Sequence, residues 1–397
     1  MSALNERDVG SCQDIVIIGS GFAAQQLVKS LRKLDGERPI RLITADNGNE
    51  YNKPDLSHVV SRGYTANAMT KLTGAQFAEQ QRIILSPNTV VHSISPTKQI
   101  VHTDHGDFSY GQLVLATGAS SIRPSMPNSD QMVTLNSQND YANAEQLIKN
   151  AKRIMVLGAG LIGCELAMDM VGQDRIVTLV DLADSPLSTL MPAALSQPLL
   201  QALREQGVDL KLGRGIKSIQ RGDANESFTI ELTDSSFSEQ DLVISAIGLQ
   251  PNLSLAMNAG LTVRRGIVVD DYLRTSSEHI YALGDCVEWK GELRPFLQPI
   301  VLGANALSKT LIGKPTPLTL PPMLVKVKTL QYPLQLAGRT KGTDLSWQFR
   351  WNKNGMVAEA RSEDGEMCGF VVGGDQMGAA FPLLRLLSRE GANKSLI

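Results

Sequence analysis

Short runs of aliphatic residues, each followed by a glycine turn and a longer mixed stretch, recur along this chain. Residues 15–18 are four aliphatic residues in a row, as is typical of a strand buried on both faces of a parallel sheet. Gly19 and Gly21 follow this run directly, and we expect a helix over residues 23–33. The pattern therefore predicts a buried strand, a tight turn and a helix.

The glycines of this turn fit the G-x-G-x-x-G/A spacing of a dinucleotide-binding turn, in which Ala24 stands at the third position. In such a turn the first glycine permits the bend, the second lets a pyrophosphate approach the backbone, and the small third residue lets helix and strand pack. The helix N-terminus offers N–H groups to the same anion. An ordinary strand-to-helix turn is the alternative. The candidate cofactor contacts here are Gly19, Ser20, Gly21, Phe22, Ala23 and Ala24.

The pattern returns in full after the buried run at residues 153–157, with glycines at Gly158, Gly160 and Gly163. Two copies are far more specific than one. The next aliphatic run ends in Asp181, about 20 residues after the last glycine, where a carboxylate accepts hydrogen bonds from an adenosine ribose and repels a 2′-phosphate. No Arg or Lys occurs in residues 182–190. This copy therefore favours NADH over NADPH.

Several other positions can be interpreted either as ligand contacts or as ordinary surface residues. Asp46 follows the first turn by about 20 residues and is a second candidate ribose contact, although a surface Asp at a strand end is the alternative. Lys53 precedes Pro54, which favours an extended conformation, and is either an anion contact or a solvated loop residue. Lys326 and Lys328 share one face of a predicted strand, where a solvated edge is the alternative. His102 and His105 fit a hairpin surface better than a metal site.

The bulk properties exclude several classes of protein. The chain has 397 residues, 42% of them hydrophobic, and a net charge of −2, so neither nucleic acid nor an anionic membrane is an expected partner. Residues 1–13 are polar and lack the apolar core of a secretory signal, and no apolar run is long enough to span a bilayer. We expect a cytoplasmic protein. The four cysteines, which lack the spacing of a disulfide scaffold, a zinc site or a redox dithiol, are Cys12, Cys164, Cys286 and Cys368.

Together these segments resemble the FAD- and NAD(P)-dependent reductases that carry two dinucleotide-binding domains. The likeness covers most of residues 14–315 and includes both glycine turns and residues 115–118, 246–248 and 281–285. Within the family the chain is most similar to the rubredoxin reductases, at residues 45–57, 158–167, 265–270 and 325–329. More narrowly it is similar to bacterial members that serve a flavorubredoxin in nitric oxide detoxification, at residues 20–24, 51–58, 134–138 and 295–300.

The resemblance implies an α/β fold with two dinucleotide-binding Rossmann-like domains, the second inserted in the first, and a small α+β C-terminal domain. The implied FAD domain spans residues 1–125 and 246–316, the NAD domain 126–245 and the C-terminal domain 317–397. The family places FAD against residues that match Lys53, Val91, Glu165, Asp285 and Lys328. Its other motif positions add Thr117, Gly118, Ile162, Gly248 and Gly284 as cofactor contacts.

The implied activity is that of an NADH-dependent reductase that passes electrons through FAD to the rubredoxin centre of a flavorubredoxin or to a rubredoxin. Hydride transfer between cofactors needs alignment rather than an acid or a base, so we expect no catalytic side chain and no metal. Residues 51–60 contain no cysteine, which favours a one-electron, iron-containing acceptor. Such partners are usually acidic, and the candidate basic rim comprises Lys53, Arg62, Lys326 and Lys328.

Three alternatives stay open on the sequence. A rubredoxin or ferredoxin reductase of another pathway would fit the same motifs. An NADH oxidase, which passes its electrons to oxygen, would fit them as well. A redox-sensing module that binds NADH as a signal would need no acceptor. The C-terminal domain is shorter than the dimer-forming domain of disulfide reductases, so we expect a monomer.

Overall fold

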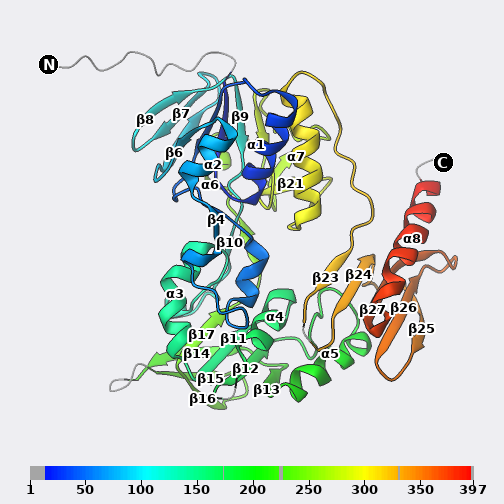
Figure 1. Ribbon diagram of the computed structural model, residues 1–397. Coiled ribbons are helices and arrows are strands. Elements are labelled where there is room, and N and C mark those ends of the chain that lie inside the picture. Colours follow the sequence, from blue (N-terminus) through cyan, green and yellow to red (C-terminus); the bar gives the residue numbers. More distant parts are fainter. Residues whose placement is uncertain (1–13, 173, 223–226, 330, 395–397) are drawn as a thin grey trace. The chain divides into compact units, whose positions relative to one another are not determined.

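The computed structural model describes residues 14–172, 174–222, 227–329 and 331–394. Residues 1–13, with Cys12, lie outside the described residues. The chain forms two compact units (Figure 1). Unit 1 comprises Met1–Lys53, Ala68–Ser120 and Leu249–Leu320, and unit 2 comprises Pro54–Asn67, Ser121–Gly248 and Pro321–Ile397.

Unit 1 is built on a five-stranded sheet in the order β20-β9-β1-β2-β5, in which every neighbouring pair is parallel. Its central strand β1 is the first aliphatic run and is buried along its whole length, as the sequence predicts. The strands are β1 (Ile15–Ile18), β2 (Ile40–Ile43), β5 (Ile84–Ser86), β9 (Gln112–Leu115) and β20 (Ile280–Ala282).

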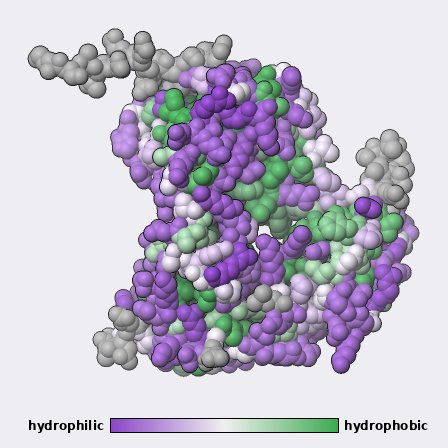
Figure 2. Space-filling view, viewed as in Figure 1, coloured by the Kyte–Doolittle hydropathy of each residue, from purple (hydrophilic) through white to green (hydrophobic). Residues whose placement is uncertain are grey.

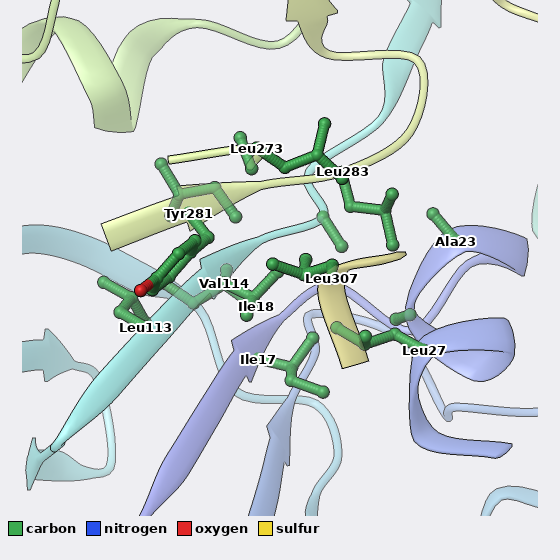
Figure 3. Close-up of a cluster of buried hydrophobic side chains, with 14 of the residues drawn as sticks. Ile17, Ile18, Ala23, Leu27, Leu113, Val114, Leu273, Tyr281, Leu283 and Leu307 are labelled. Atoms are coloured by element: carbon green, nitrogen blue, oxygen red, sulfur yellow. The ribbon is translucent and has the colours of Figure 1, made fainter. Parts of the chain in front are cut away.

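Two long helices pack together in unit 1, α1 (Phe22–Leu34) and α7 (Leu297–Leu311) (Figure 1). The hydroxyl of Ser30 donates a hydrogen bond to Asn305 across this contact at 2.9 Å. Figure 3 shows the core between helices and sheet, where Leu27 and Leu307 lie near Ile17 and Ile18. Because these side chains are buried, the start of α1 is held in a fixed place at the end of β1.

Smaller elements complete unit 1. The predicted hairpin turn at His105 and Gly106 is confirmed, because β7 and β8 pair antiparallel on either side of it. The other elements are β3 (Glu50–Tyr51), η2 (Asn67–Met69), β4 (Thr70–Leu72), α2 (Gly74–Gln81), β6 (Val91–Ser95), β7 (Ile100–Thr103), β8 (Gly106–Ser109), β10 (Ala119–Ser121), β18 (Leu249–Pro251), α6 (Ser254–Asn258), β19 (Ile267–Val269), β21 (Val287–Trp289) and β22 (Glu292–Leu293).

Unit 2 repeats the design with a four-stranded parallel sheet in the order β13-β12-β11-β17. The second glycine turn joins β11 to α4, in the same way as the first turn joins β1 to α1. The elements are η1 (Lys53–His58), η3 (Ser129–Gln131), α3 (Gln138–Asn150), β11 (Arg153–Leu157), α4 (Leu161–Met170), β12 (Ile176–Asp181), α5 (Ala193–Glu205), β13 (Val208–Leu212), β14 (Ile216–Arg221), β15 (Phe228–Leu232), β16 (Phe237–Gln240) and β17 (Leu242–Ser245).

The C-terminal residues form a separate antiparallel sheet in the order β23-β24-β27-β26-β25, with α8 against it. Trp347, Phe349 and Trp351 alternate along the edge strand β25, and their three rings stack in sequence. Hydrophilic residues cover most of the face that Figure 2 shows, and hydrophobic residues are visible around this sheet. The elements are β23 (Val325–Val327), β24 (Leu334–Gly338), β25 (Ser346–Trp351), β26 (Gly355–Arg361), β27 (Met367–Gly374), η4 (Asp375–Ala379) and α8 (Ala380–Lys394).

The α/β class with two dinucleotide-type sheets is thus confirmed. The sequence did not indicate that residues 54–67 and the C-terminal residues group with the second glycine turn in one compact unit. The three domain boundaries stay a prediction. Among the described helices, none combines the length and the apolar character that a membrane crossing requires.

Candidate dinucleotide-binding sites

In the first glycine turn, Gly19 is crowded by neighbouring atoms, whereas Gly21 faces open space. Gly19 has φ +102°, and a Cβ there would meet the carbonyl oxygen of Ala116 at 2.3 Å, so only glycine fits. A Cβ on Gly21 would meet no atom within 4 Å. Ala24 is fully buried against the core. Gly21 therefore faces room that a ligand can fill, while Gly19 and Ala24 serve the packing of the turn.

The helix that begins at this turn has an N-terminus that can bind an anion. α1 has Gly21 as its N-cap, no side chain caps it, and its first turn contains no acidic residue. Its positive dipole end and its first N–H groups are therefore not countered by a carboxylate of the helix itself. Ser20 is buried, and Phe22 and Ala23 form the first residues of the helix.

The second turn in unit 2 has the same design. Gly158 has φ +105°, and a Cβ there would meet the carbonyl oxygen of Ala246 at 2.6 Å. Gly163 lies still closer to the backbone, with a Cβ position only 1.7 Å from the oxygen of Gly158, whereas Gly160 faces open space. α4 also lacks a side-chain cap and an acidic first turn. Ile162, in that first turn, is 49% exposed, an apolar surface beside the open side of the turn.

The two predicted ribose carboxylates differ in their bonding. Asp46 accepts hydrogen bonds from Ser20 Oγ at 2.7 Å, Thr44 Oγ1 at 2.7 Å and Gly48 N at 2.8 Å, and all three reach Oδ1. Asp181 uses both oxygens, with Ala159 N at 2.5 Å from Oδ2 and Ala183 N at 2.7 Å from Oδ1. Each carboxylate is thus oriented both by its own loop and by the glycine turn next to it, through Ser20 in the first case and Ala159 in the second.

A buried carboxylate atom lies at the end of β20 in unit 1. Oδ1 of Asp285 is buried and has no hydrogen-bond partner among the described residues, while Oδ2 lies 3.8 Å from Lys53 Nζ. Gly284 has φ +96°, and a Cβ there would come within 2.8 Å of Ala23, so this glycine lets Asp285 approach the start of α1. An orphaned buried oxygen has a large desolvation cost, and a hydroxyl of a bound molecule would remove that cost.

The loop after β9 is held rigidly. Thr117 Oγ1 donates to the carbonyl of Asn252 at 3.1 Å, and the Asn252 amide donates back to the Thr117 carbonyl at 2.8 Å. The backbone of Asn252 also bonds Gly118, which has φ +64°. Sequence reasoning did not select Asn252, because nothing in its local pattern reveals a partner so far along the chain.

The remaining predicted contacts fall in both units. Val91 begins β6 and packs against the core of unit 1. Gly248 in unit 2 has φ +121°, and its carbonyl accepts from Ile122 N. Lys328 follows β23 with an exposed side chain, and its backbone N–H donates to Glu165 Oε1 at 2.9 Å. Unit 2 therefore brings Glu165 and Lys328 together, as a shared site requires.

Sequence reasoning missed three further residues near Glu165, which are Ser57, His58 and Asp169. Ser57 Oγ donates to Glu165 Oε2 at 2.6 Å, and His58 Nε2 lies 3.9 Å from the same oxygen. Asp169, one turn further along α4, accepts from the backbone of residues 60 and 61 at 2.9 and 3.1 Å. The signal available in the sequence was the spacing of two acids, four residues apart, on an otherwise apolar helix.

The described cysteines are unpaired, and two of them are fully buried. Burial raises the pKa of the Cys164 thiol well above its usual value, and the carboxylates of Asp181 and Glu165 add to this shift. Burial likewise raises the pKa of Cys286. A raised pKa disfavours the reactive thiolate. The described residues contain no group of three or more His, Cys, Asp or Glu side chains arranged to hold a metal ion.

Comparison with known proteins agrees with this geometry. Residues 13–304 match the model of the pyridine nucleotide-disulphide oxidoreductase family, and the chain belongs to that family. Residues 317–387 match the model of a rubredoxin binding C-terminal domain. The family and the fold class that the sequence predicts are thereby confirmed.

Individual proteins and solved structures show in more detail what the chain is similar to. The chain is 69% identical to the nitric oxide reductase FlRd-NAD(+) reductase of Aeromonas salmonicida, over 98% of this chain and 100% of the relative. It is 48% identical to the protein of the same name from Escherichia coli O139:H28, over 94% and 98% of the two chains. Among solved structures, a ferredoxin reductase from Rhodopseudomonas palustris superposes with a TM-score of 0.83 at 26% identity, over 91% of each chain. The NADH:rubredoxin oxidoreductase of Clostridium acetobutylicum has the same fold, with a TM-score of 0.78 at 19% identity, over 95% and 94% of the chains.

Proposed function

We propose that this chain is an NADH-dependent flavoprotein reductase that delivers electrons through FAD to the rubredoxin centre of a flavorubredoxin, in the cytoplasm, as part of nitric oxide detoxification. The observation that carries the proposal is the identity of 69% and 48%, over nearly the whole chain, to relatives named nitric oxide reductase FlRd-NAD(+) reductase. The match of residues 317–387 to a rubredoxin binding domain supports the same acceptor.

The residues of unit 1 fit FAD. The open space at Gly21 and the uncapped start of α1 suit a pyrophosphate. Asp46 is held through Oδ1, so Oδ2 is the oxygen that would accept from a ribose. The unpartnered Oδ1 of Asp285 would accept from a hydroxyl of the ribityl chain. Lys53, Val91, Thr117, Gly118 and Gly284 complete the proposed FAD site, to which the resemblance adds Glu165 and Lys328.

The residues of unit 2 fit NADH. The space at Gly160 suits the second pyrophosphate, and Ile162 offers an apolar surface beside it. Each oxygen of Asp181 already has one backbone donor and keeps a second lone pair for a ribose hydroxyl. A 2′-phosphate at that place would meet a fixed negative charge. The proposed NADH site consists of Gly158, Gly160, Ile162, Gly163, Asp181 and Gly248.

Bound FAD would supply the redox chemistry, because it accepts a hydride from NADH and releases electrons one at a time. The protein itself holds the two cofactors, aligns them and excludes water. Lys328 would place a positive charge at the pyrimidine end of the flavin ring, where reduction concentrates negative charge. No protein thiol is required, in agreement with the buried state of Cys164 and Cys286.

The proposed partner is an acidic, iron-containing rubredoxin domain that meets a basic rim. Arg62, Lys326 and Lys328 have exposed side chains, and Lys53 is partly exposed. Complementary charge raises the association rate at low salt more than it raises affinity. We propose that the protein acts as a monomer and needs neither nucleic acid nor a membrane.

The decisive experiment reduces the yellow holoenzyme with NADH in a stopped-flow instrument and then mixes it with a flavorubredoxin rubredoxin domain, a ferredoxin or oxygen. We expect fast bleaching by NADH and fast reoxidation by the rubredoxin domain, with a rate that falls as salt increases. Faster reoxidation by the ferredoxin would favour a reductase of another pathway, and rapid peroxide formation would favour an oxidase. A flavin that NADH fails to bleach would indicate a binding module instead.

A further inference from the structure

The loop that follows Asp181 in unit 2 folds back onto the second glycine turn. We name residues 182–191 the coenzyme loop, because they follow the proposed ribose carboxylate. Ala159, which lies between the first two glycines of the turn, donates its N–H to Asp181 Oδ2 at 2.5 Å. Its carbonyl accepts the N–H of Leu187, from the coenzyme loop, at 2.8 Å. The strand end and the loop therefore bond both backbone groups of the central residue of the turn.

The middle of the coenzyme loop has an uncommon backbone conformation. Leu187 has φ +55°, in the left-handed region that a bulky side chain rarely adopts, and its side chain is fully buried. Its carbonyl accepts from Leu190 N at 2.8 Å and from Met191 N at 3.1 Å. Such a conformation persists only where surrounding contacts hold it, so the shape of the loop depends on its neighbours.

Two side chains of the C-terminal sheet contact this loop, both from the connection between β24 and β25. Thr340 Oγ1 donates to the carbonyl of Leu190 at 2.5 Å, and Lys341 Nζ donates to the carbonyl of Ser188. Thr340 is 6% exposed, so its hydrogen bond is shielded from water, whereas Lys341 is exposed. All of these residues belong to unit 2. The sheet that matches a rubredoxin binding domain thus bonds the loop that holds the coenzyme turn.

The connection that carries the two donors is itself fixed to β27. The backbone N–H of Arg339 donates to the carbonyl of Cys368 at 2.8 Å, and its guanidinium pairs with Asp344 at 2.5 Å. A Cβ on Gly369 would lie 2.5 Å from the carbonyl oxygen of Arg339, so the two backbones are in close contact. The backbone directly before Thr340 is therefore held in place, and the donors approach the loop from a rigid support.

We propose that Thr340 and Lys341 are positioning residues, which hold the coenzyme loop against the second glycine turn and so raise the affinity for NADH. The inference rests on the proposed function, because it assumes that NADH binds at this turn. A cation can also attract an anionic coenzyme without holding any loop, which is the alternative role for Lys341. Thr340 is uncharged, so an effect of Thr340 on NADH binding requires the contact with the loop.

The first test removes the hydroxyl of Thr340. Thr340→Val keeps the shape of the side chain and removes the donor, whereas Thr340→Ser keeps the donor. We expect KM for NADH to rise about 3- to 10-fold in Thr340→Val with kcat within about 2-fold, and both values to stay within about 2-fold in Thr340→Ser. Thr343→Val, at an exposed position of the same connection, is the matched control and should change neither value. Equal KM values in Thr340→Val and Thr340→Ser, or a fall in kcat alone, would overturn the proposal.

The second test separates the hydrogen bond of Lys341 from its charge. Lys341→Met should raise KM for NADH about 2- to 5-fold, and the increase should persist at about 0.5 M salt, where interactions between exposed charges are screened. Lys341→Arg keeps a donor for Ser188 and should stay within about 2-fold of wild type. Lys353→Met, at an exposed lysine between β25 and β26, is the control. An effect that vanishes at high salt, or that Lys353→Met reproduces, would overturn the positioning role of Lys341.

Amide hydrogen exchange tests the contact without any coenzyme. In the Thr340→Val, Lys341→Met double variant, the N–H of Leu187 should exchange at least about 10-fold faster than in the wild-type holoenzyme. The N–H of Leu179, in the central part of β12, should keep its protection, which shows that the sheet remains folded. Unchanged exchange at Leu187 would overturn the proposal even if KM rose. Failure of NADH to reduce the wild-type enzyme would instead contradict the proposed function, which the exchange measurement does not use.

Discussion

The carboxylate of Asp181, at the end of β12, accepts the backbone N–H of Ala159 in the second glycine turn, at a distance of 2.5 Å. The residue proposed to bind a ribose therefore also holds the turn proposed to bind the pyrophosphate. Removal of the whole side chain would disturb both, so a test of coenzyme preference should retain an acceptor.

Asp181→Asn combined with Leu182→Arg is the variant that meets this condition, because Asn keeps one acceptor and Leu182 is 77% exposed. We expect kcat/KM for NADH to fall about 10- to 100-fold, the cost of lost hydrogen bonds to a charged group, and the value for NADPH to rise. Steady-state kinetics with both coenzymes measure the change. Asp209→Asn, on the neighbouring strand β13, serves as control, and an unchanged preference in the double variant would remove Asp181 from the site.

Gly21 and Gly19 should respond differently to alanine. A methyl group on Gly21 enters open space, so we expect the free energy of unfolding of the apoprotein to change by less than about 1 kcal/mol, while FAD affinity falls at least about 10-fold. A methyl group on Gly19 meets Ala116 O and a φ of +102°, which should cost about 2–4 kcal/mol of stability. Chemical denaturation and flavin titration separate the two. Full FAD content in Gly21→Ala would show that no cofactor occupies this space.

The corresponding substitution in the second glycine turn, at Gly160, should weaken the binding of NADH rather than that of FAD. Gly160→Ala also enters open space, in unit 2, so we expect normal FAD content and a KM for NADH that rises about 10-fold or more. Flavin absorbance of the purified variant and NADH saturation curves give both quantities. Loss of FAD with unchanged KM for NADH would reverse the proposed assignment of the two turns.

The glycine turns were predictable because each is a local pattern, in which a few adjacent residues must satisfy one bend and one helix start. The strands β1 and β11, buried on both faces, were predictable for the same reason. Gly158 and Gly163 show how strict such a pattern is, since their backbones lie too close to neighbouring atoms for any Cβ. Physical crowding within one turn leaves a clear trace in sequence.

Contacts between distant segments left no such trace. Ser57 and Asp169 belong to the Glu165 cluster only because η1 and the segment after it fold onto α4. Asn252 locks the loop of Thr117 from a position well over a hundred residues later. Single polar residues of these types are common on surfaces, so their role follows from three-dimensional proximity and not from spacing.

Asp285 should be more important to the cofactor than to the fold. Its Oδ1 is buried without a partner among the described residues, so Asp285→Asn should leave the stability of the apoprotein equal or higher and weaken FAD binding about 10-fold or more. Asp270→Ala is the opposite control, because Asp270 accepts from Tyr272 N and Arg274 N in an exposed turn. That variant should lower stability and leave FAD affinity unchanged. Equal FAD affinity in Asp285→Asn would place the ribityl chain elsewhere.

The buried cysteines should be inert in the native enzyme at neutral and mildly alkaline pH. The thiolate forms as pH rises through the pKa, and burial raises the pKa of Cys164 and Cys286, so both remain protonated where an exposed cysteine already ionises. We expect alkylation between about pH 7 and 9 to modify the partly exposed Cys368 and to spare both buried thiols until the protein unfolds, as peptide mass mapping will show. The Cys164→Ala, Cys286→Ala double variant should keep its FAD and retain NADH-driven turnover within about 3-fold, because the electrons need no protein thiol. A double variant that holds FAD and is reduced by NADH, but no longer passes electrons to the rubredoxin domain, would show that a thiol takes part in the transfer.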